Sequence, residues 1–338
     1  MTAAGTKKIV VTTLRFLISF GAIGIILYLF REQLPAVVDH LRGADPGYFL
    51  LALVVFFAGH IFVAQRLRAV LEVHQAGLTL WQVYYVNLVG LFFNNVLPSS
   101  VGGEMVKAYY IYRGTNGKVA AFSAVVVDRL FGLVVMVAIG LTALALFGRG
   151  LASPRIVGSV AGLALVVVLV MVAIFNTRIV NGLCRARIPL MPMVLAEKLK
   201  EMYQAMYHYR GQHGIILRCL GLTALGQISF IIVNYLLARS LSLDIPLTFF
   251  FFFVPIILIL TMAPSVNGIG VREATYLFYL AGFATSDRAL ALSVFTTFFM
   301  IFTGIIGGLA YAVKGGLEKE SGEGRGARDE GRGTRDEG

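Results

Sequence analysis

The stretch from Asn94 to Lys107, NNVLPSSVGGEMVK, constrains the fold more than any other part of the sequence. It places proline, glycine, amides and charges inside a long apolar segment. Hydrocarbon tolerates such a backbone only where protein or trapped water surrounds it. A second break of the same kind, from Ala263 to Glu273 (APSVNGIGVRE), interrupts a later apolar segment. The breaks predict two broken helical hairpins embedded in a membrane, with the transported group handled between their tips.

The composition supports a membrane location. Hydrophobic residues make up 58% of the chain and charged residues 14%, against about 45–50% and 25% in ordinary soluble domains. The net charge of +11 comes from basic residues scattered between apolar runs. This scatter argues against a nucleic-acid partner, because such proteins gather their basic residues on one surface. Cys184 and Cys219 have no metal-ligand spacing and form no disulfide framework, so we expect them to be small apolar residues.

Apolar runs of transmembrane length predict about six full crossings in an all-α polytopic membrane protein. The runs begin near residues 9, 47, 119, 157, 215 and 289. We expect the second run to end at Ala64. The run from Val119 contains Asp128 and Arg129. If its helix begins near Val119, both charges lie close to mid-bilayer; if it begins at Leu130, they cap it at the interface. The sequence leaves both possibilities open.

The apolar arms beside each break are shorter than the ~20 residues that a full crossing needs. The first break lies between the arms 81–97 and 105–112, and the second between 247–263 and 271–283. Short arms favour two oppositely oriented re-entrant helical hairpins that form an inverted repeat. Lysine and arginine are more frequent in the loops on the side of the two termini. The positive-inside rule therefore places both termini in the cytoplasm, and the result is the same if each hairpin is read as two full crossings.

The remaining segments have simpler predictions. The long loop from Asn176 to Gly214 contains apolar residues at helical spacing, which predict a cytoplasmic amphipathic helix. They are Leu195, Leu199, Met202, Met206 and Tyr209. Residues 1–317 are expected to form one transmembrane domain, and the charged, glycine-rich residues 318–338 a disordered tail. Glycines in the last apolar run predict close helix packing at Gly304, Gly307 and Gly308.

The two breaks share a pattern that has a physical use. In both, serine follows the proline and a glycine stands at the fourth position after it, at Gly102 and Gly268. Proline ends the first arm, and glycine lets the backbone turn. The second arm then begins with free N–H groups and a positive dipole end inside the membrane. Such a helix start receives an anion well, and a phosphate above all.

Charged residues near the breaks complete the predicted site. Arg129 and Arg272 would give an anion charge-assisted hydrogen bonds. Three acidic residues would balance these arginines in the empty site, or carry protons if transport is coupled: Glu104, Asp128 and Glu273. We expect the substrate-binding residues to be Arg129, Arg272, Glu104, Asp128, Glu273, Lys107, Asn95, Ser99, Ser100, Gly102, Gly103, Ser265, Asn267, Gly268 and Gly270. No catalytic residue, metal site or cofactor is expected.

A purely structural role for the same residues stays open. Glu104 and Lys107 are three residues apart and would pair on one helix face. Arg272 and Glu273 would pair with other helices to make their burial tolerable. Three asparagines would either line a cavity or cap freed backbone groups: Asn94, Asn95 and Asn267. His60, alone in an apolar run, is expected to be a packed residue.

Three motifs in order carry a resemblance to a known family. They are Asn94 to Lys107, Val127 to Gly132 (VDRLFG), and Pro264 to Glu273 with its GxGxRE core. From Ile9 to Val313 the sequence resembles the lysylphosphatidylglycerol synthase transmembrane-region family, also described as UPF0104 or flippase-like. The resemblance implies an all-helical inner-membrane protein similar to the flippase portion of the multiple peptide resistance factor. Movement of lysyl-phosphatidylglycerol between leaflets is attributed to that portion, and other members look like transporters of phospholipids or polyprenyl-linked lipids.

Only a polar tail follows Val313, so we do not expect synthesis of an aminoacylated lipid. The expected function is translocation of an anionic phospholipid or a polyprenyl-phosphate-linked lipid, whose head group lies between the hairpin tips. A membrane enzyme acting on a lipid phosphate is a first alternative, although the histidines are dispersed and no loop carries a metal-binding motif. A proton-coupled small-ion exchanger that uses Glu104 and Glu273 is a second.

Overall fold

The computed structural model describes most of the predicted membrane region. The described residues are 42–74, 77–96, 100–114, 117–151, 154–175, 211–261 and 270–314, together with Tyr28 and Asp39. Within these ranges the chain forms nine α-helices and no strand. The first predicted span, the predicted amphipathic helix at 195–209 and the tail at 318–338 lie outside the described residues. The predicted helical class is therefore confirmed for the part of the chain that the structure describes.

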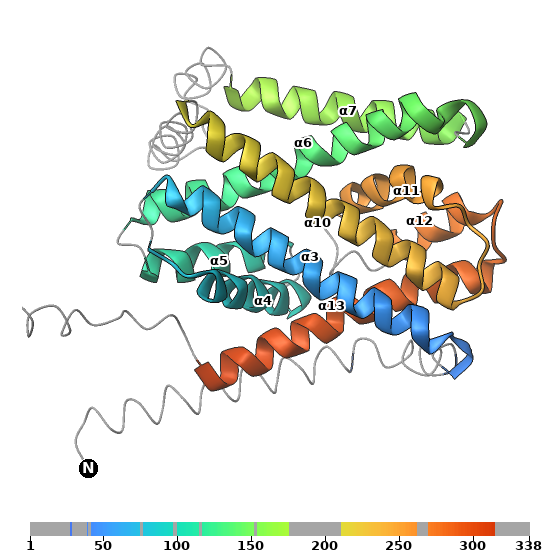
Figure 1. The fold of residues 1–338 in the computed structure, drawn as a ribbon, viewed down its shortest axis with the longest axis horizontal. Helices are drawn as coiled ribbons and strands as arrows, with labels where there is room; N and C mark the ends of the chain where they lie inside the picture. Colours follow the sequence, from blue (N-terminus) through green and yellow to red (C-terminus); the bar gives the residue numbers. More distant parts are fainter. Residues whose placement is uncertain are drawn as a thin grey trace, which may run out of the picture.

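Long helices form the frame of the molecule. They are α3 (Pro46–Glu72), α6 (Lys118–Leu151), α7 (Pro154–Phe175), α10 (His213–Ser240) and α13 (Ser286–Lys314). Four of these helices, all except α7, contain stretches long and apolar enough to cross a membrane. Their positions match the runs predicted near residues 47, 119, 215 and 289. Figure 1 shows α3 and α10 side by side along most of their length.

Helix α3 is longer than predicted. Asp45 caps its start, because its carboxylate accepts the N–H of Gly47 at 2.8 Å, and Pro46 suits the first helical turn. The helix then runs past Ala64 to Glu72, so the predicted end at Ala64 is wrong. Arg66 looked like a loop residue, but it is buried within the helix. An acidic partner on another helix makes this burial tolerable, as described below.

Helix α6 decides between the two readings of Asp128 and Arg129. It is continuous from Lys118 to Leu151, so the reading with a start near Val119 is correct and the reading with a start at Leu130 is wrong. Both residues lie inside the helix, roughly 15 Å from its start at 1.5 Å per residue. Their side chains therefore project from the helix body and do not cap its end.

The arms beside the breaks form short helices. They are α4 (Leu80–Val96), α5 (Ser100–Gly114), α11 (Leu247–Leu260) and α12 (Val271–Leu280). With 17 and 10 residues, α4 and α12 are the longest and the shortest of them. They measure about 26 and 15 Å, against about 30 Å of hydrocarbon. Figure 1 shows α4 and α5 at one end of the molecule and α11 and α12 at the other. Whether these helices stop inside a bilayer stays a prediction.

The first break is shorter than the sequence indicated. Helix α5 begins at Ser100, so Gly102 and Gly103 are helical, and the predicted turn at Gly102 is wrong. Gly103 serves close packing instead, because a Cβ there would collide with the carbonyl oxygen of Gly90 on α4. In the second break, Gly270 does take a conformation that favours glycine, with φ of 80°.

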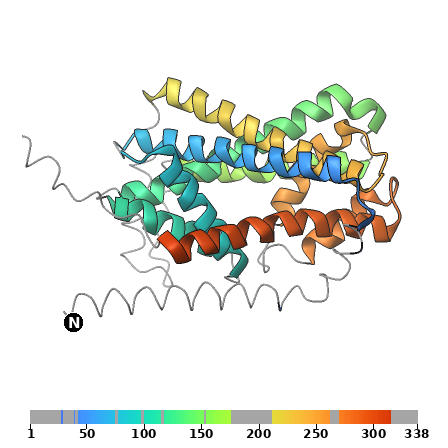
Figure 2. The same cartoon turned by 60° about the horizontal axis from the view of Figure 1, so that its bottom comes forward.

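Helix α13 contacts both pairs of short helices. Toward α4 it presents glycines, since a Cβ at Gly307 would collide with the backbone of Leu88 and one at Gly308 with the ring of Phe92. The predicted role of these glycines in close packing is confirmed. Figure 2 shows α13 running along the lower side of the bundle, below α3.

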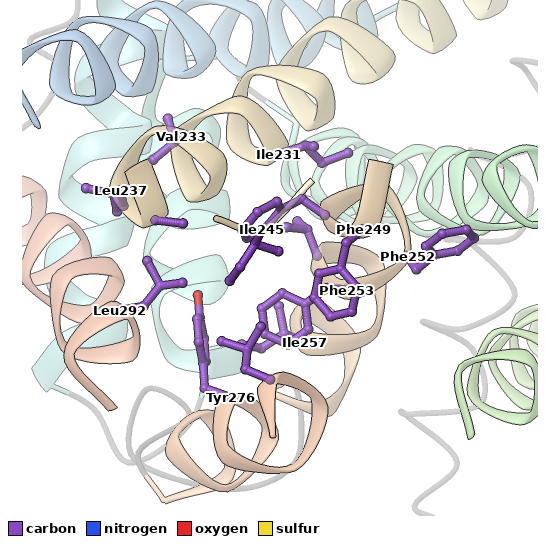
Figure 3. Packing of buried hydrophobic residues seen from close by; sticks show 14 of the residues in the cluster. Ile231, Val233, Leu237, Ile245, Phe249, Phe252, Phe253, Ile257, Tyr276 and Leu292 are labelled. Atoms are coloured by element: carbon purple, nitrogen blue, oxygen red, sulfur yellow. The ribbon is translucent and has the colours of Figure 1, made fainter. Parts of the chain in front are cut away.

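An aromatic core surrounds the second pair. Phe249, Phe253 and Tyr276 are fully buried, and the rings of Phe253 and Tyr276 meet edge to face with centroids 4.8 Å apart. Figure 3 shows side chains from α10, α11, α12 and α13 pointing toward one another here. The Tyr276 hydroxyl is satisfied inside this core, because it donates to Asn234 Oδ1 at 2.6 Å. This packing holds α12 firmly against α10 and α13.

Candidate functional site

A central cavity of about 350 Å³ lies between the two pairs of short helices. It is lined by residues of α3, α4, α5, α6, α10, α11, α12 and α13. Three of the four helix ends that face the breaks contribute: Asn94 and Asn95 from the last turn of α4, Thr261 after α11, and Arg272 from the first turn of α12. The volume falls within the range of roughly 300–1,000 Å³ that is usual for small-ligand sites.

The charged side chains that line the cavity are mainly basic. Four are basic and two are acidic: Arg66, Lys107, Arg129, Arg272, Glu104 and Asp128. The difference is an excess of two positive charges in a site with low-dielectric walls. Such walls concentrate the field of the charges that they enclose. The cavity therefore has the electrostatic character of an anion site.

Arg66 and Asp128 form the best-ordered ion pair of the cavity. Arg66 Nε lies 2.6 Å from Asp128 Oδ1, and Nη2 donates to Oδ2 at 2.8 Å. The exposed fractions of the side chains are only 10% for Arg66 and 3% for Asp128. Both carboxylate oxygens are occupied in this bidentate geometry. The pair therefore joins α3 to α6 inside the bundle.

Glu104 is held by two cations. On its own helix, Lys107 Nζ lies 3.2 Å from Glu104 Oε2, as the spacing of three residues allows. From α6, Arg129 Nη2 donates to Glu104 Oε1. Arg129 keeps 42% of its side chain exposed, compared with 13% for Glu104. This second cluster links α5 to α6, and its arginine is the accessible member.

Arg272 and Glu273 are adjacent in sequence, but their side chains have different surroundings. Arg272 lines the cavity from the start of α12 and donates to Thr297 Oγ1 at 2.6 Å. Glu273 is not among the lining residues; its carboxylate accepts the N–H of Gly270 at 2.6 Å and the hydroxyl of Ser293 at 3.4 Å. Glu273 thus satisfies the start of its own helix, and Arg272 faces the cavity at the positive end of the helix dipole.

The asparagines and glycines of the first break mainly organise the backbone. Asn94 Oδ1 accepts the N–H of Gly103 at 3.0 Å, and Asn95 Nδ2 donates to the carbonyl of Met300 at 3.1 Å. Four further predicted positions lie outside the described residues: Ser99, Ser265, Asn267 and Gly268. Ser100 is described as the first residue of α5, but its side chain is not. Gly102 lies within α5 and Gly270 just before α12; neither is among the lining residues of the cavity.

Several lining residues were not predicted. Arg66 was missed because nothing in its local sequence separates it from the basic residues that flank apolar runs. On α10, Thr223 and Gln227 line the cavity. Their spacing of four residues in an otherwise apolar run is a detectable signal, because it places polar groups on one helix face. His60 also lines the cavity; its ring lies tilted against that of Phe56, with centroids 4.5 Å apart, and its Nδ1 lies 2.9 Å from the Phe56 carbonyl oxygen.

Comparison with known proteins agrees with these features. A family described as lysylphosphatidylglycerol synthase TM region matches residues 12–308. A UPF0104 membrane protein of Methanocaldococcus jannaschii is 29% identical over 126 residues. That alignment covers 36% of this chain and 37% of the relative, so the match spans little more than a third of the relative's length. Because the family match extends over most of the chain, this membrane protein belongs to the lysylphosphatidylglycerol synthase transmembrane-region family.

Proposed function

We propose that this protein moves an anionic lipid, either a phospholipid or a polyprenyl-phosphate-linked lipid, from one leaflet to the other. The head group occupies the central cavity. The observation that carries the proposal is the excess of two positive charges in a cavity that both pairs of short helices line. Phosphate is a preferred ligand of arginine and of helix starts. Both features are present at Arg272, which lies in the first turn of α12.

The lipid tails remain in the bilayer while the head group moves. The outer surface of the bundle suits this arrangement, since α7 exposes a row of aliphatic side chains: Leu165, Val166, Val168 and Leu169. The cavity is of small-ligand size and accommodates a head group without its chains. The polar head group is then surrounded by the polar cavity, and the apolar chains stay in the hydrocarbon of the bilayer.

The same proposal gives the short helices a topology. The pair α4 and α5 enters from the cytoplasmic face, and the pair α11 and α12 enters from the opposite face of the cytoplasmic membrane. Both termini are cytoplasmic. In support, the helix ends that point away from the breaks lie at opposite ends of the bundle in Figure 1: those of α4 and α5 at one end and those of α11 and α12 at the other. Short helices that stop in the membrane bring their polar ends to the cavity without exposing them to lipid.

The alternatives make different demands on the site. Under the proposal, this chain catalyses no covalent reaction, whereas an enzyme would convert a lipid phosphate into a product. A small-ion exchanger that uses Glu104 and Glu273 needs both carboxylates on one path. Glu104 lines the cavity and Glu273 is engaged at the start of α12. This separation favours lipid translocation over the exchanger.

The test is transbilayer movement of a fluorescently labelled anionic lipid in proteoliposomes, followed by chemical quenching of the outer leaflet. Arg129→Ala and Arg272→Ala should each slow this movement by at least about tenfold, because each removes a charged hydrogen-bond donor worth roughly 1.5–3 kcal/mol. Arg239→Ala is the matched control, since Arg239 lies outside the cavity lining and pairs with the exposed Asp244.

Unchanged movement in both cavity variants would contradict the assigned site. Circular dichroism and gel filtration of each variant separate loss of binding from loss of folding. Product formation by the purified protein from a lipid phosphate would replace translocation with an enzymatic function. Mass spectrometry of lipids that co-purify with the protein identifies the head group.

A further inference from the structure

The two acidic residues of the cavity are held in different geometries. Asp128 gives both carboxylate oxygens to Arg66, at 2.6 and 2.8 Å. Glu104 gives one oxygen to a single guanidinium nitrogen of Arg129, and its other oxygen lies 3.2 Å from Lys107 Nζ. The bidentate pair is the more rigid, because two parallel bonds fix its geometry. An incoming anion therefore displaces Glu104 more easily than it displaces Asp128.

Arg129 has capacity for a second partner. A guanidinium group offers five N–H donors. Glu104 is the hydrogen-bond partner of Arg129 within the described residues, and it engages Nη2 only. With 42% of its side chain exposed, Arg129 is also the more accessible side of this pair. The remaining donors can take a phosphate oxygen.

We propose that Glu104 is a built-in counter-anion, which occupies the place of a phosphate oxygen on Arg129 and Lys107 until a phosphate group displaces it. This inference rests on the proposed function and deepens it, because it names the group with which the substrate competes. Displacement moves no covalent bond: one carboxylate leaves two cations, and one phosphate replaces it. On release of the phosphate, Glu104 returns and neutralises the cations.

The exchange also changes how the helices are linked. Within the described residues, the bond from Arg129 to Glu104 is the polar side-chain contact between α6 and α5. When phosphate takes Arg129, α5 loses this link but keeps its bond to α4, from the Gly103 N–H to Asn94. The first pair of short helices then keeps its apolar packing on α6 but has lost its polar tie to that helix. Substrate binding is thereby coupled to movement of that pair.

The test measures binding to the full chain in detergent by isothermal titration calorimetry. The probes are inorganic phosphate and a short-chain phosphatidate, which share the phosphate group and differ in the lipid part. Glu104→Gln should bind both probes at least about tenfold more tightly than the wild type, because the competing charged hydrogen bonds are weakened. Tighter binding of the phosphatidate than of inorganic phosphate shows that the lipid part contributes.

Two further variants separate direct competition from a general change of charge. Glu104→Asp keeps the negative charge but shortens its reach, so binding should tighten by less than in Glu104→Gln yet exceed the wild type. Asp128→Asn makes the same charge change as Glu104→Gln in the same cavity, at the carboxylate that is locked to Arg66. Its effect on phosphate affinity should be smaller than that of Glu104→Gln.

The inference is overturned if Glu104→Gln binds phosphate no more tightly than the wild type, or if neither protein binds it. Equal tightening in Asp128→Asn and Glu104→Gln, with none in Glu104→Asp, also overturns it, since charge alone then explains the effect. These results are independent of lipid movement. Tighter binding in Glu104→Gln by a protein that moves no lipid would contradict the proposed function and leave the counter-anion in place.

Discussion

The two pairs of short helices look alike in sequence but differ in chemistry. In the pair α4 and α5, helix α5 meets α6 through apolar packing and through the ion pair of Glu104 with Arg129, which is partly exposed to the cavity. The pair α11 and α12 is embedded in aromatic side chains and in neutral hydrogen bonds around Tyr276. Charged contacts that reach a cavity can be exchanged for a ligand, whereas a packed aromatic core resists movement. Under the proposed function, the first pair is therefore the one whose contacts change when a ligand binds, and the second pair supports it.

Helix α13 shows the same division along its length. Toward α12 it presents hydroxyl groups, with Thr297 accepting from Arg272 and Thr296 lying 2.9 Å from the Tyr276 hydroxyl. Toward α4 it presents Gly304, Gly307 and Gly308. Hydroxyls fix one partner by direction, while glycines admit the other mainly by shape, beside the single bond from Asn95 to the Met300 carbonyl. The two contacts are suited to a fixed and a sliding neighbour.

The largest expected effect comes from breaking the buried ion pair of Arg66 and Asp128. Asp128→Ala leaves Arg66 buried without its acidic partner, which should lower the free energy of unfolding by about 3 kcal/mol or more. Denaturant-induced unfolding in detergent, followed by circular dichroism, measures this loss. Asp244→Ala is the matched control, because Asp244 is fully exposed in its pair with Arg239. Equal stability of the two variants would contradict the role given to the Arg66 and Asp128 pair.

The second effect concerns the glycine contact between α13 and α4. Gly307→Ala forces a methyl group against the backbone of Leu88, so the helices must separate at a cost of about 1–3 kcal/mol. The same unfolding measurement tests it. Gly162→Ala on α7 provides the comparison, since no atom lies within 4 Å of a Cβ there, and alanine should be tolerated or slightly stabilising. If both substitutions were tolerated, close packing of α4 on α13 would lose its support.

The smallest effect is expected in the aromatic core around α11 and α12. Tyr276→Phe removes the hydroxyl bonded to Asn234 and Thr296 but keeps the ring and its packing. We expect a loss of about 1 kcal/mol in unfolding free energy, with lipid movement unchanged in rate. Tyr235→Phe is the control, because the Tyr235 hydroxyl has no hydrogen-bond partner within the described residues. A strong effect of Tyr276→Phe on lipid movement would place the second pair among the moving parts.

The long helices could be predicted because each leaves a strong local signal. An apolar run of transmembrane length has few other structures available to it. The predicted starts near residues 47, 215 and 289 lie within a few residues of α3, α10 and α13. The order of these helices along the chain follows directly from the order of the apolar runs. Re-entrance and the side of the termini depend on a bilayer and stay predictions.

The partners inside the cavity could not be predicted in the same way. Arg66 and Asp128 are 62 residues apart, and no spacing rule connects residues on different helices. The neighbouring Arg129 looked equally able to balance Asp128, yet it faces Glu104. Successive residues of a helix point about 100° apart, so adjacent charges reach different neighbours. Only the packing of α3 and α5 on α6 decides which partner each one meets.

For a protein placed in the cytoplasmic membrane, as proposed, the basic lining of the cavity also bears on the proton gradient. A polar space inside a coupling membrane is a hazard, since hydronium ions that cross it dissipate the proton gradient. Arginine side chains and the positive ends of short helices repel cations from a pore. Arg66, Arg129 and Arg272, with Lys107, line this space. The charges that would attract a lipid phosphate also form an electrostatic barrier, so the membrane can hold a polar passage and still keep its voltage.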